Sequence, residues 1–140
     1  MKQKLLCALI LGIGLLLSGS VIAEIAVIVH PTNNASVDQS ELNRLFLGRG
    51  NSFSDGSRAT PMNLAEGVPA RESFDNKVLN RSSAQLKAYW SRLVFTGKGT
   101  PPPEHANAAA MKAAVAADPT AIGYIASSEV DDSVRVVATF

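Results

Sequence analysis

An uncharged apolar run, Leu5–Ala23, follows two lysines, Lys2 and Lys4, at the start of the chain. Positive charge, an apolar stretch and a small-residue exit are the three parts of a secretory signal peptide. We therefore predict a cleaved signal peptide over residues 1–23 and an exported domain over residues 24–140. A retained N-terminal anchor is the alternative, because the run is close to the length of a membrane span. The Ser- and Gly-containing end of the run, with no charge cluster after it, favours cleavage and no stable membrane insertion afterwards.

Cleavage at this point sets the size and the chemistry of the remaining chain. It leaves 117 of the 140 residues, a length that predicts one domain with a single core. It also removes Cys7, the only cysteine. The exported part then has no disulfide, no thiolate metal ligand and no cysteine nucleophile, so burial of apolar side chains must stabilise it.

The charge of the exported part excludes one class of partner. Lys2 and Lys4 are two of the 13 basic residues, so 11 remain against 12 Asp and Glu, a net charge of −1. Binding to nucleic acid needs a basic face, and attachment to an anionic membrane surface needs a basic cluster. We expect neither partner.

The first elements after the predicted cleavage site are a buried strand and a helix. Residues 24–30 are nearly continuous apolar and rich in β-branched side chains, which is typical of a strand buried on both faces, as in parallel sheets. Asp38 and Glu41 have the spacing of a capping box at a helix start, with a start one turn earlier at Ser36 as the alternative. Gly48 is expected to end this helix in a left-handed cap.

The rest of the chain continues to alternate strands and helices. We expect an edge strand over residues 59–64, a helix from Pro69 to about Leu79, a second helix from Ser82 or Ser83 with apolar positions from Leu86 to Val94, an alanine-rich helix from Asn107 to about Ala117, and strands over residues 121–125 and 134–140. Gly123 is expected to mark a close approach between elements, and Tyr89 and Trp90 to pack in the core. This alternation predicts an α/β fold with helices against a mixed β-sheet.

The sequence carries no pattern of a catalytic or metal site. His30 and His105 lie far apart and have no metal-ligand spacing, and no serine lies in a nucleophile-elbow pattern. Residues 96–100, Thr-Gly-Lys-Gly-Thr, lack the spacing of a phosphate loop and run into three prolines. We therefore expect a protein that is not an enzyme, with no catalytic residues, no metal and no cofactor.

One segment, residues 63–74, has the features of an anion site. A strand end leads through Gly67 into a helix start, where unpaired backbone N–H groups and the helix dipole favour negative charge. Asn63, Arg71 and Ser73 can add side-chain donors, which makes these three residues and Gly67 the candidate ligand-binding residues. Glu72 in the same first turn would compete for the amides, so a plain solvent-exposed helix start remains the alternative.

Four pieces of the chain occur in the order found in one known family: Leu45–Arg49, Gly67–Phe74, Trp90 and Ala121–Ile125. With them the sequence resembles the phosphate-type substrate-binding proteins of ABC transporters, as a short, single-lobe member. The resemblance implies a periplasmic-binding-protein-like (type 2) fold, a mixed β-sheet flanked by helices, and a location in the periplasm. It further implies phosphate or a related oxyanion as ligand, and the membrane subunits of an ABC transporter as partners.

The resemblance and the residues leave two functions open. The first is a periplasmic solute-binding protein for phosphate or a related oxyanion. The second is a non-transport interaction module that uses the same fold to bind an envelope protein. The second is suggested by the single-lobe length and by the lack of the Ser-Gly-Thr run that grips phosphate in full-length members.

Overall fold

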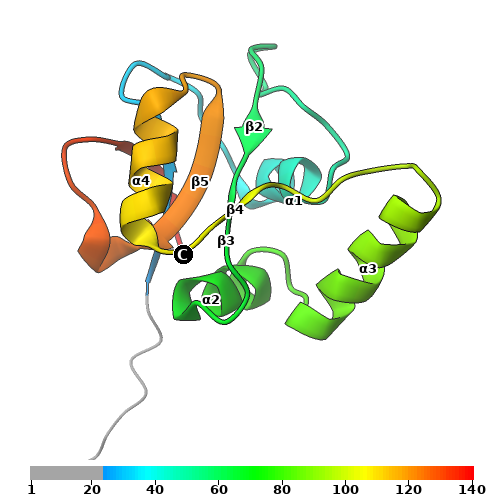
Figure 1. The fold of residues 1–140 in the computed structure, drawn as a ribbon. Helices are drawn as coiled ribbons and strands as arrows, with labels where there is room; N and C mark the ends of the chain where they lie inside the picture. The colour runs from blue at the N-terminus through cyan, green and yellow to red at the C-terminus, as the bar shows by residue number, and fades with distance from the viewer. Residues whose placement is uncertain (1–23) are drawn as a thin grey trace, which may run out of the picture.

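A four-stranded mixed sheet forms the centre of residues 24–140, the part of the chain that this computed structural model describes (Figure 1). The predicted signal peptide, residues 1–23, lies outside the described residues. In order across the sheet, the strands are β2 (Thr60–Pro61), β5 (Ala121–Ala126), β1 (Ile25–Val29) and β6 (Arg135–Thr139). The predicted α/β class with a mixed sheet is confirmed.

The central strand β1 is buried along its whole length but does not run as the sequence suggested. All five of its residues are buried, as predicted. It pairs antiparallel with β5 on one side and with β6 on the other, whereas β2 and β5 alone form the parallel pair of this sheet. The expectation of a parallel environment was therefore wrong. A continuous apolar run reports burial on both faces, and a central strand under packed helices has that burial whatever its direction.

A second, two-stranded sheet joins two distant segments. Strand β3 (Asn63–Leu64) follows β2 directly and pairs in parallel with β4 (Glu104–His105). The predicted strand over residues 59–64 is thus split between two sheets. Pro61 lies in β2 at the edge of the larger sheet, where its missing N–H leaves no ladder bond unmade, as expected.

Four α-helices were expected, and the described residues contain them close to their predicted bounds: α1 (Gln39–Phe46), α2 (Pro69–Lys77), α3 (Ser83–Phe95) and α4 (Ala108–Ala117). A short 3₁₀ helix, η1 (Ser127–Glu129), follows β5. Side chains close in sequence fix where the α-helices begin. Ser82 and Gln85 form a reciprocal capping box at α3, and the Asn107 side chain accepts from the backbone N–H of Ala110 at α4, 2.9 Å away.

The ends of α1 show how closely side-chain chemistry sets a helix. Its N-cap is Asp38, whose carboxylate accepts from the backbone N–H of Glu41 at 2.8 Å, so the alternative start one turn earlier is not used. At the other end Gly48 has φ of +71°. The N–H groups of Gly48 and Arg49 bond back to the carbonyls of Leu45 and Arg44, the two bonds of a Schellman motif.

The core is centred on an aromatic cluster beneath the sheet. The rings of Phe74 on α2 and Tyr124 on β5 are stacked with centroids 3.8 Å apart, and Phe46 on α1 packs edge-on against both. Helix α4 lies directly on β5, because a Cβ on Gly123 would come 2.4 Å from the sulfur of Met111. The predicted close approach at Gly123 is confirmed.

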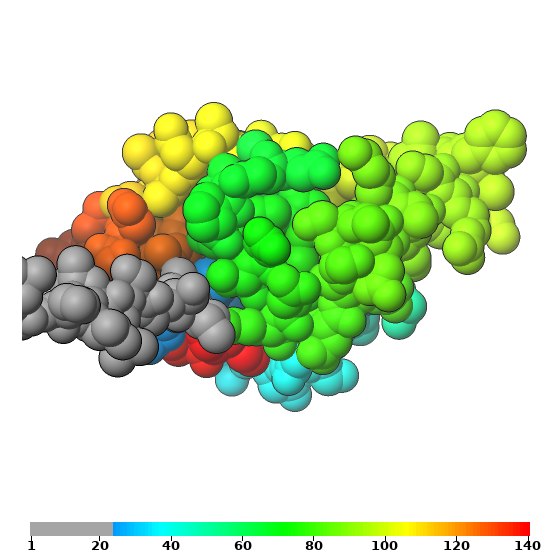
Figure 2. Space-filling view, turned by 90° about the horizontal axis from the view of Figure 1, so that it is seen from below, coloured from blue at the N-terminus to red at the C-terminus, as the bar shows by residue number. Residues whose placement is uncertain are grey.

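Helix α3 extends away from the rest of the molecule (Figures 1 and 2). It is attached through its middle. The Tyr89 hydroxyl donates to the Leu47 carbonyl at 2.6 Å, and Trp90, 8% exposed, lies against Gly48. The predicted packing of Trp90 is confirmed, but the apolar stripe does not stay buried to its end, because Val94 is 54% exposed. None of the helices in residues 24–140 has both the length and the apolar character needed to cross a membrane.

Candidate functional site

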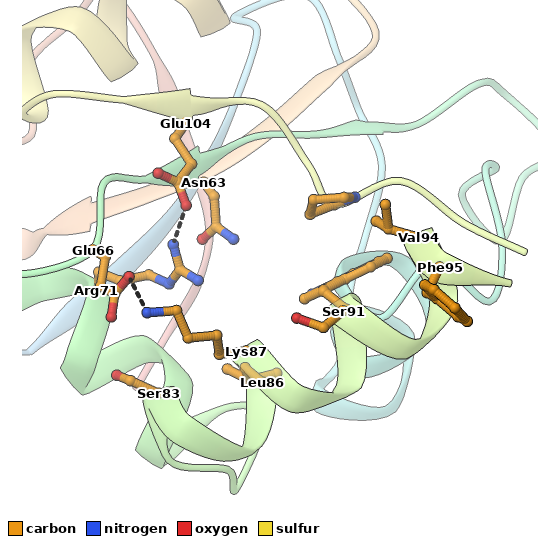
Figure 3. A pocket seen from close by; sticks show the side chains of 12 residues that line it. Asn63, Glu66, Arg71, Ser83, Leu86, Lys87, Ser91, Val94, Phe95 and Glu104 are labelled. Carbon is orange, nitrogen blue, oxygen red and sulfur yellow. Dashed lines mark hydrogen bonds and ion pairs between the residues drawn. The ribbon is translucent and has the colours of Figure 1, made fainter. Parts of the chain in front are cut away.

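A cavity of about 500 Å³ lies where α3 faces the start of α2 and the β3–β4 pair (Figure 3). Its wall has two chemically different parts. Charged and polar side chains are contributed by β3, β4, α2, α3 and the turn between β3 and α2: Asn63, Glu66, Arg71, Ser83, Lys87, Ser91 and Glu104. Apolar side chains come from α3 and the loop after it: Leu86, Trp90, Val94, Phe95 and Pro101.

Asn63 presents its amide NH₂ to this cavity, and a residue far along the chain fixes that orientation. The Tyr124 hydroxyl accepts from the backbone N–H of Leu64 at 3.2 Å, so its own proton goes to the Asn63 side chain. The atom that receives it must be the amide oxygen, because the NH₂ group cannot accept. The NH₂ donors are therefore left on the cavity side, where Figure 3 shows the end of Asn63.

Arg71 crosses the base of the cavity and is held on one side by oxygen atoms. Its Nε donates to Asp75 Oδ2 at 2.9 Å, and its Nη1 donates to the Leu64 carbonyl at 2.7 Å and to Glu104 Oε1 at 3.2 Å. A guanidinium has five N–H groups in a fixed plane. Nη2 keeps its two N–H groups for a ligand, since no described residue accepts from it.

Asp75 explains why Arg71 is so firmly placed. It is 1% exposed, and its Oδ1 has no hydrogen-bond partner among the described residues. Burial raises the pKa of Asp75, and the adjacent Arg71 charge opposes that rise. Arg71 therefore serves the fold as well as the cavity.

The charges around the cavity nearly cancel. Arg71 and Lys87 face Glu66 and Glu104, and Lys87 Nζ lies 3.7 Å from Glu66 Oε2. Both members of that pair are well exposed, so it contributes little energy and Lys87 can turn to a ligand at small cost. The site has convergent donors without a strong positive potential.

The structure brings two of the four predicted residues together. Asn63 and Arg71 both line the cavity, whereas Gly67 and Ser73 lie outside its lining. Gly67 has φ of +89° in the turn before α2, where only glycine is unstrained, so its conformation serves the turn. The backbone N–H of Arg71 bonds to the Val68 carbonyl at 2.9 Å, which leaves the helix start a weaker donor than expected.

Sequence reasoning missed the contribution of α3 and β4. Ser83, Lys87 and Ser91 recur every four residues, a spacing that places them on one face of a helix. That pattern was visible and indicates a polar face. Nothing local indicates that this face lies opposite Glu104.

The comparisons with known proteins identify the fold of this chain but no family. The sequence matches no model of a known protein family and no curated protein. Nor does any group of three His, Cys, Asp or Glu within residues 24–140 have the arrangement of a metal site.

Three solved structures are similar to the described chain. They are a phosphate ABC transporter substrate-binding protein with bound phosphate from Clostridium perfringens (TM-score 0.65, 22% identity), an ABC-type phosphate transport receptor from Vibrio cholerae (0.64, 16%) and PstS from Borrelia burgdorferi (0.58, 11%). Each match covers 83% of this chain but only 45%, 46% and 47% of the other. The resemblance drawn from the sequence is thus confirmed at the level of fold: the chain has the mixed α/β fold of periplasmic binding proteins over less than half of their length.

Proposed function

We propose that this protein is an exported, periplasmic solute-binding protein whose cavity binds phosphate or a related oxyanion. The observation that carries the proposal is the convergence of donors from three elements on one cavity. The Asn63 NH₂ on β3 and Arg71 Nη2 on α2 have no acceptor among the described residues, and Lys87 Nζ on α3 has only a weak, exposed ion pair with Glu66. The fold shared with phosphate-transport receptors supports it. Delivery of the solute to the membrane subunits of an ABC transporter would be the corresponding role.

Two of the three donors are held in place before a ligand arrives. Tyr124 holds the Asn63 amide, and Asp75 holds Arg71, so neither must be ordered when a ligand arrives. Hydrogen bonds from a guanidinium or an ammonium group to an oxyanion are shorter and stronger than neutral ones. Glu66 and Glu104 reduce the attraction, and one side of the cavity is open, so we expect a modest affinity.

Calorimetric titration of inorganic phosphate into the purified protein, with sulfate as comparison, tests the proposal. Binding must also raise the melting temperature, because the ligand stabilises the state that it binds. The absence of both heat and a melting shift at millimolar phosphate would contradict the proposal.

Two variants locate the binding. Asn63→Asp keeps an oxygen for the Tyr124 hydroxyl but replaces the NH₂ donor with a second oxygen, so it should abolish oxyanion binding. Lys87→Gln should weaken binding several-fold, since the Lys87 side chain is 72% exposed and its loss leaves the fold unchanged. Lys98→Gln, in the exposed loop after α3, is the matched control and should bind like the unaltered protein.

The second function, an interaction module for an envelope protein, is favoured by a different observation. Phe95 at the end of α3 is 92% exposed, and Val94 beside it is 54% exposed. Exposed apolar side chains gathered at one place often mark a protein contact. Affinity capture from a periplasmic extract with the unaltered protein and with Phe95→Ser tests it; equal enrichment by both would count against this function.

A further inference from the structure

The cavity has two ends of opposite chemistry. Asn63, Arg71 and Glu104 lie at one end, and Val94 and Phe95 lie at the other (Figure 3). The two cations that would hold an inorganic oxyanion, Arg71 and Lys87, lie away from Val94 and Phe95. The apolar end has no role in holding such an ion.

The cavity is also larger than an inorganic ion requires. Its volume of about 500 Å³ falls within the range of pockets that enclose small organic molecules, roughly 300–1,000 Å³. A phosphate ion displaces on the order of two or three waters, each with about 30 Å³ of liquid volume. Most of the cavity would remain solvent around an inorganic ion.

The exposure of the apolar end indicates what the remaining space accepts. Val94 and Phe95 are 54% and 92% exposed, whereas Trp90 and Leu86, one and two turns earlier on α3, are 8% and 2% exposed. A ligand that carried an apolar group would remove the exposed area from water against a rigid, packed base. Removal of apolar area from water is favourable in proportion to that area.

Electrostatic attraction contributes little to the affinity for an anionic ligand. Two cationic and two anionic side chains line the cavity, so their net attraction for an anionic head is small. The donors would orient the head, and the apolar contact would provide most of the binding free energy.

We infer that the cavity takes an organic oxyanion, an anionic head that carries an aryl or branched alkyl group, in preference to a bare inorganic ion. This inference rests on the proposed function, because the head uses the same Asn63, Arg71 and Lys87 donors. The apolar group lies along the end of α3 against Trp90, Val94 and Phe95.

Titration calorimetry with phenylphosphonate, inorganic phosphate and benzyl alcohol, each added to the purified protein, tests it. Phenylphosphonate should bind roughly ten- to hundredfold more tightly than phosphate, the gain expected from burial of one side-chain-sized apolar group. Benzyl alcohol, which lacks the head, should give no detectable heat.

Variants at the exposed end separate the two parts of the ligand. Val94→Ser and Phe95→Ser should weaken phenylphosphonate binding about tenfold together and leave phosphate binding unchanged. The matched control is Val136→Ser, which removes an apolar side chain that is 39% exposed on β6, outside the cavity. It should leave both affinities unchanged, and a melting curve of each variant establishes that it is folded.

The outcomes distinguish this inference from the function on which it rests. Equal affinity for phosphate and phenylphosphonate would overturn the inference and leave the proposed function in place. Tight phenylphosphonate binding that is insensitive to Val94→Ser and Phe95→Ser would also overturn it, because the apolar group would then lie elsewhere. Binding of neither ion would overturn the proposed function and the inference with it.

Discussion

Replacement of Arg71 by leucine should strongly destabilise the protein, because Arg71 compensates a carboxylate that is removed from water. Asp75 is 1% exposed, and its Oδ2 accepts a hydrogen bond from Arg71 Nε at 2.9 Å. Its Oδ1 has no hydrogen-bond partner among the described residues. Removal of one partner of a buried ion pair costs about 3–5 kcal/mol, since it leaves an uncompensated charge. That is a large share of the roughly 5–15 kcal/mol by which a domain is stable, and for this length it lowers the melting temperature by on the order of 10–20 °C.

Urea unfolding followed by fluorescence measures this loss. The single tryptophan, Trp90, is 8% exposed in the folded state, so unfolding should change its emission. Arg71→Leu with Asp75→Asn should recover most of the lost stability, because the double variant no longer buries a charge. Arg92→Leu, an exposed arginine on α3, is the control and should lie within about 0.5 kcal/mol of the unaltered protein.

The pH dependence gives an independent check on the cause. Without Arg71, the pKa of Asp75 should rise further, since the charge that opposed the effect of burial is gone. A folded-state pKa above the unfolded value near 3.9 means that stability falls as pH rises between the two values. The deficit of Arg71→Leu should therefore shrink as pH falls from 7 towards 4. A loss below about 1 kcal/mol at pH 7, or a double variant no better than the single one, would refute the reasoning.

Three further changes have definite outcomes. Gly123→Ala would place a Cβ 2.4 Å from the sulfur of Met111 and should cost about 1–3 kcal/mol in urea unfolding by forcing α4 away from β5; an unchanged unfolding midpoint would contradict that close packing. Burial raises the pKa of Tyr124 well above 10, so a comparison with Tyr124→Phe by ultraviolet absorbance should show no ionisation of Tyr124 near pH 10. Stability should then fall above that pH, because the unfolded chain releases this proton first; ionisation of Tyr124 near pH 10 would refute the assignment. The Lys112 ammonium and the Ser133 hydroxyl lower the pKa of Asp131 to about 2, and NMR titration should show Lys112→Gln moving it towards the usual value; no movement would mean that Lys112 is not the cause.

Much of the fold could be predicted because its signals are local. Asp38 and Ser82 cap helices through backbone groups three residues away, and Gly48 ends α1 through bonds within one turn. Apolar runs and their flanking turns likewise identify β1 and β5 without reference to the rest of the chain. Such features depend on neighbours in sequence, so the sequence carries them almost in full.

The sequence indicated only part of the candidate site, because the other part depends on how distant segments pack together. Asn63 and Arg71 stood out because they flank a strand end and a helix start within one short segment. Lys87 and Glu104 did not, because their relevance depends on where α3 and β4 lie relative to that segment. Gly67 was singled out for its place in the segment, although its backbone conformation serves the turn.

The amino-acid sequence by itself thus determined where the four α-helices and strands β1 and β5 lie, and that β1 is buried. Only the tertiary structure decided that β1 runs antiparallel to both neighbours, since burial does not depend on strand direction. It also decided which end of the Asn63 amide faces the cavity, through a Tyr124 hydroxyl that is 61 residues away in the chain. Hydrogen bonds between distant residues fix the chemistry of the cavity, and they exist only once the chain has folded.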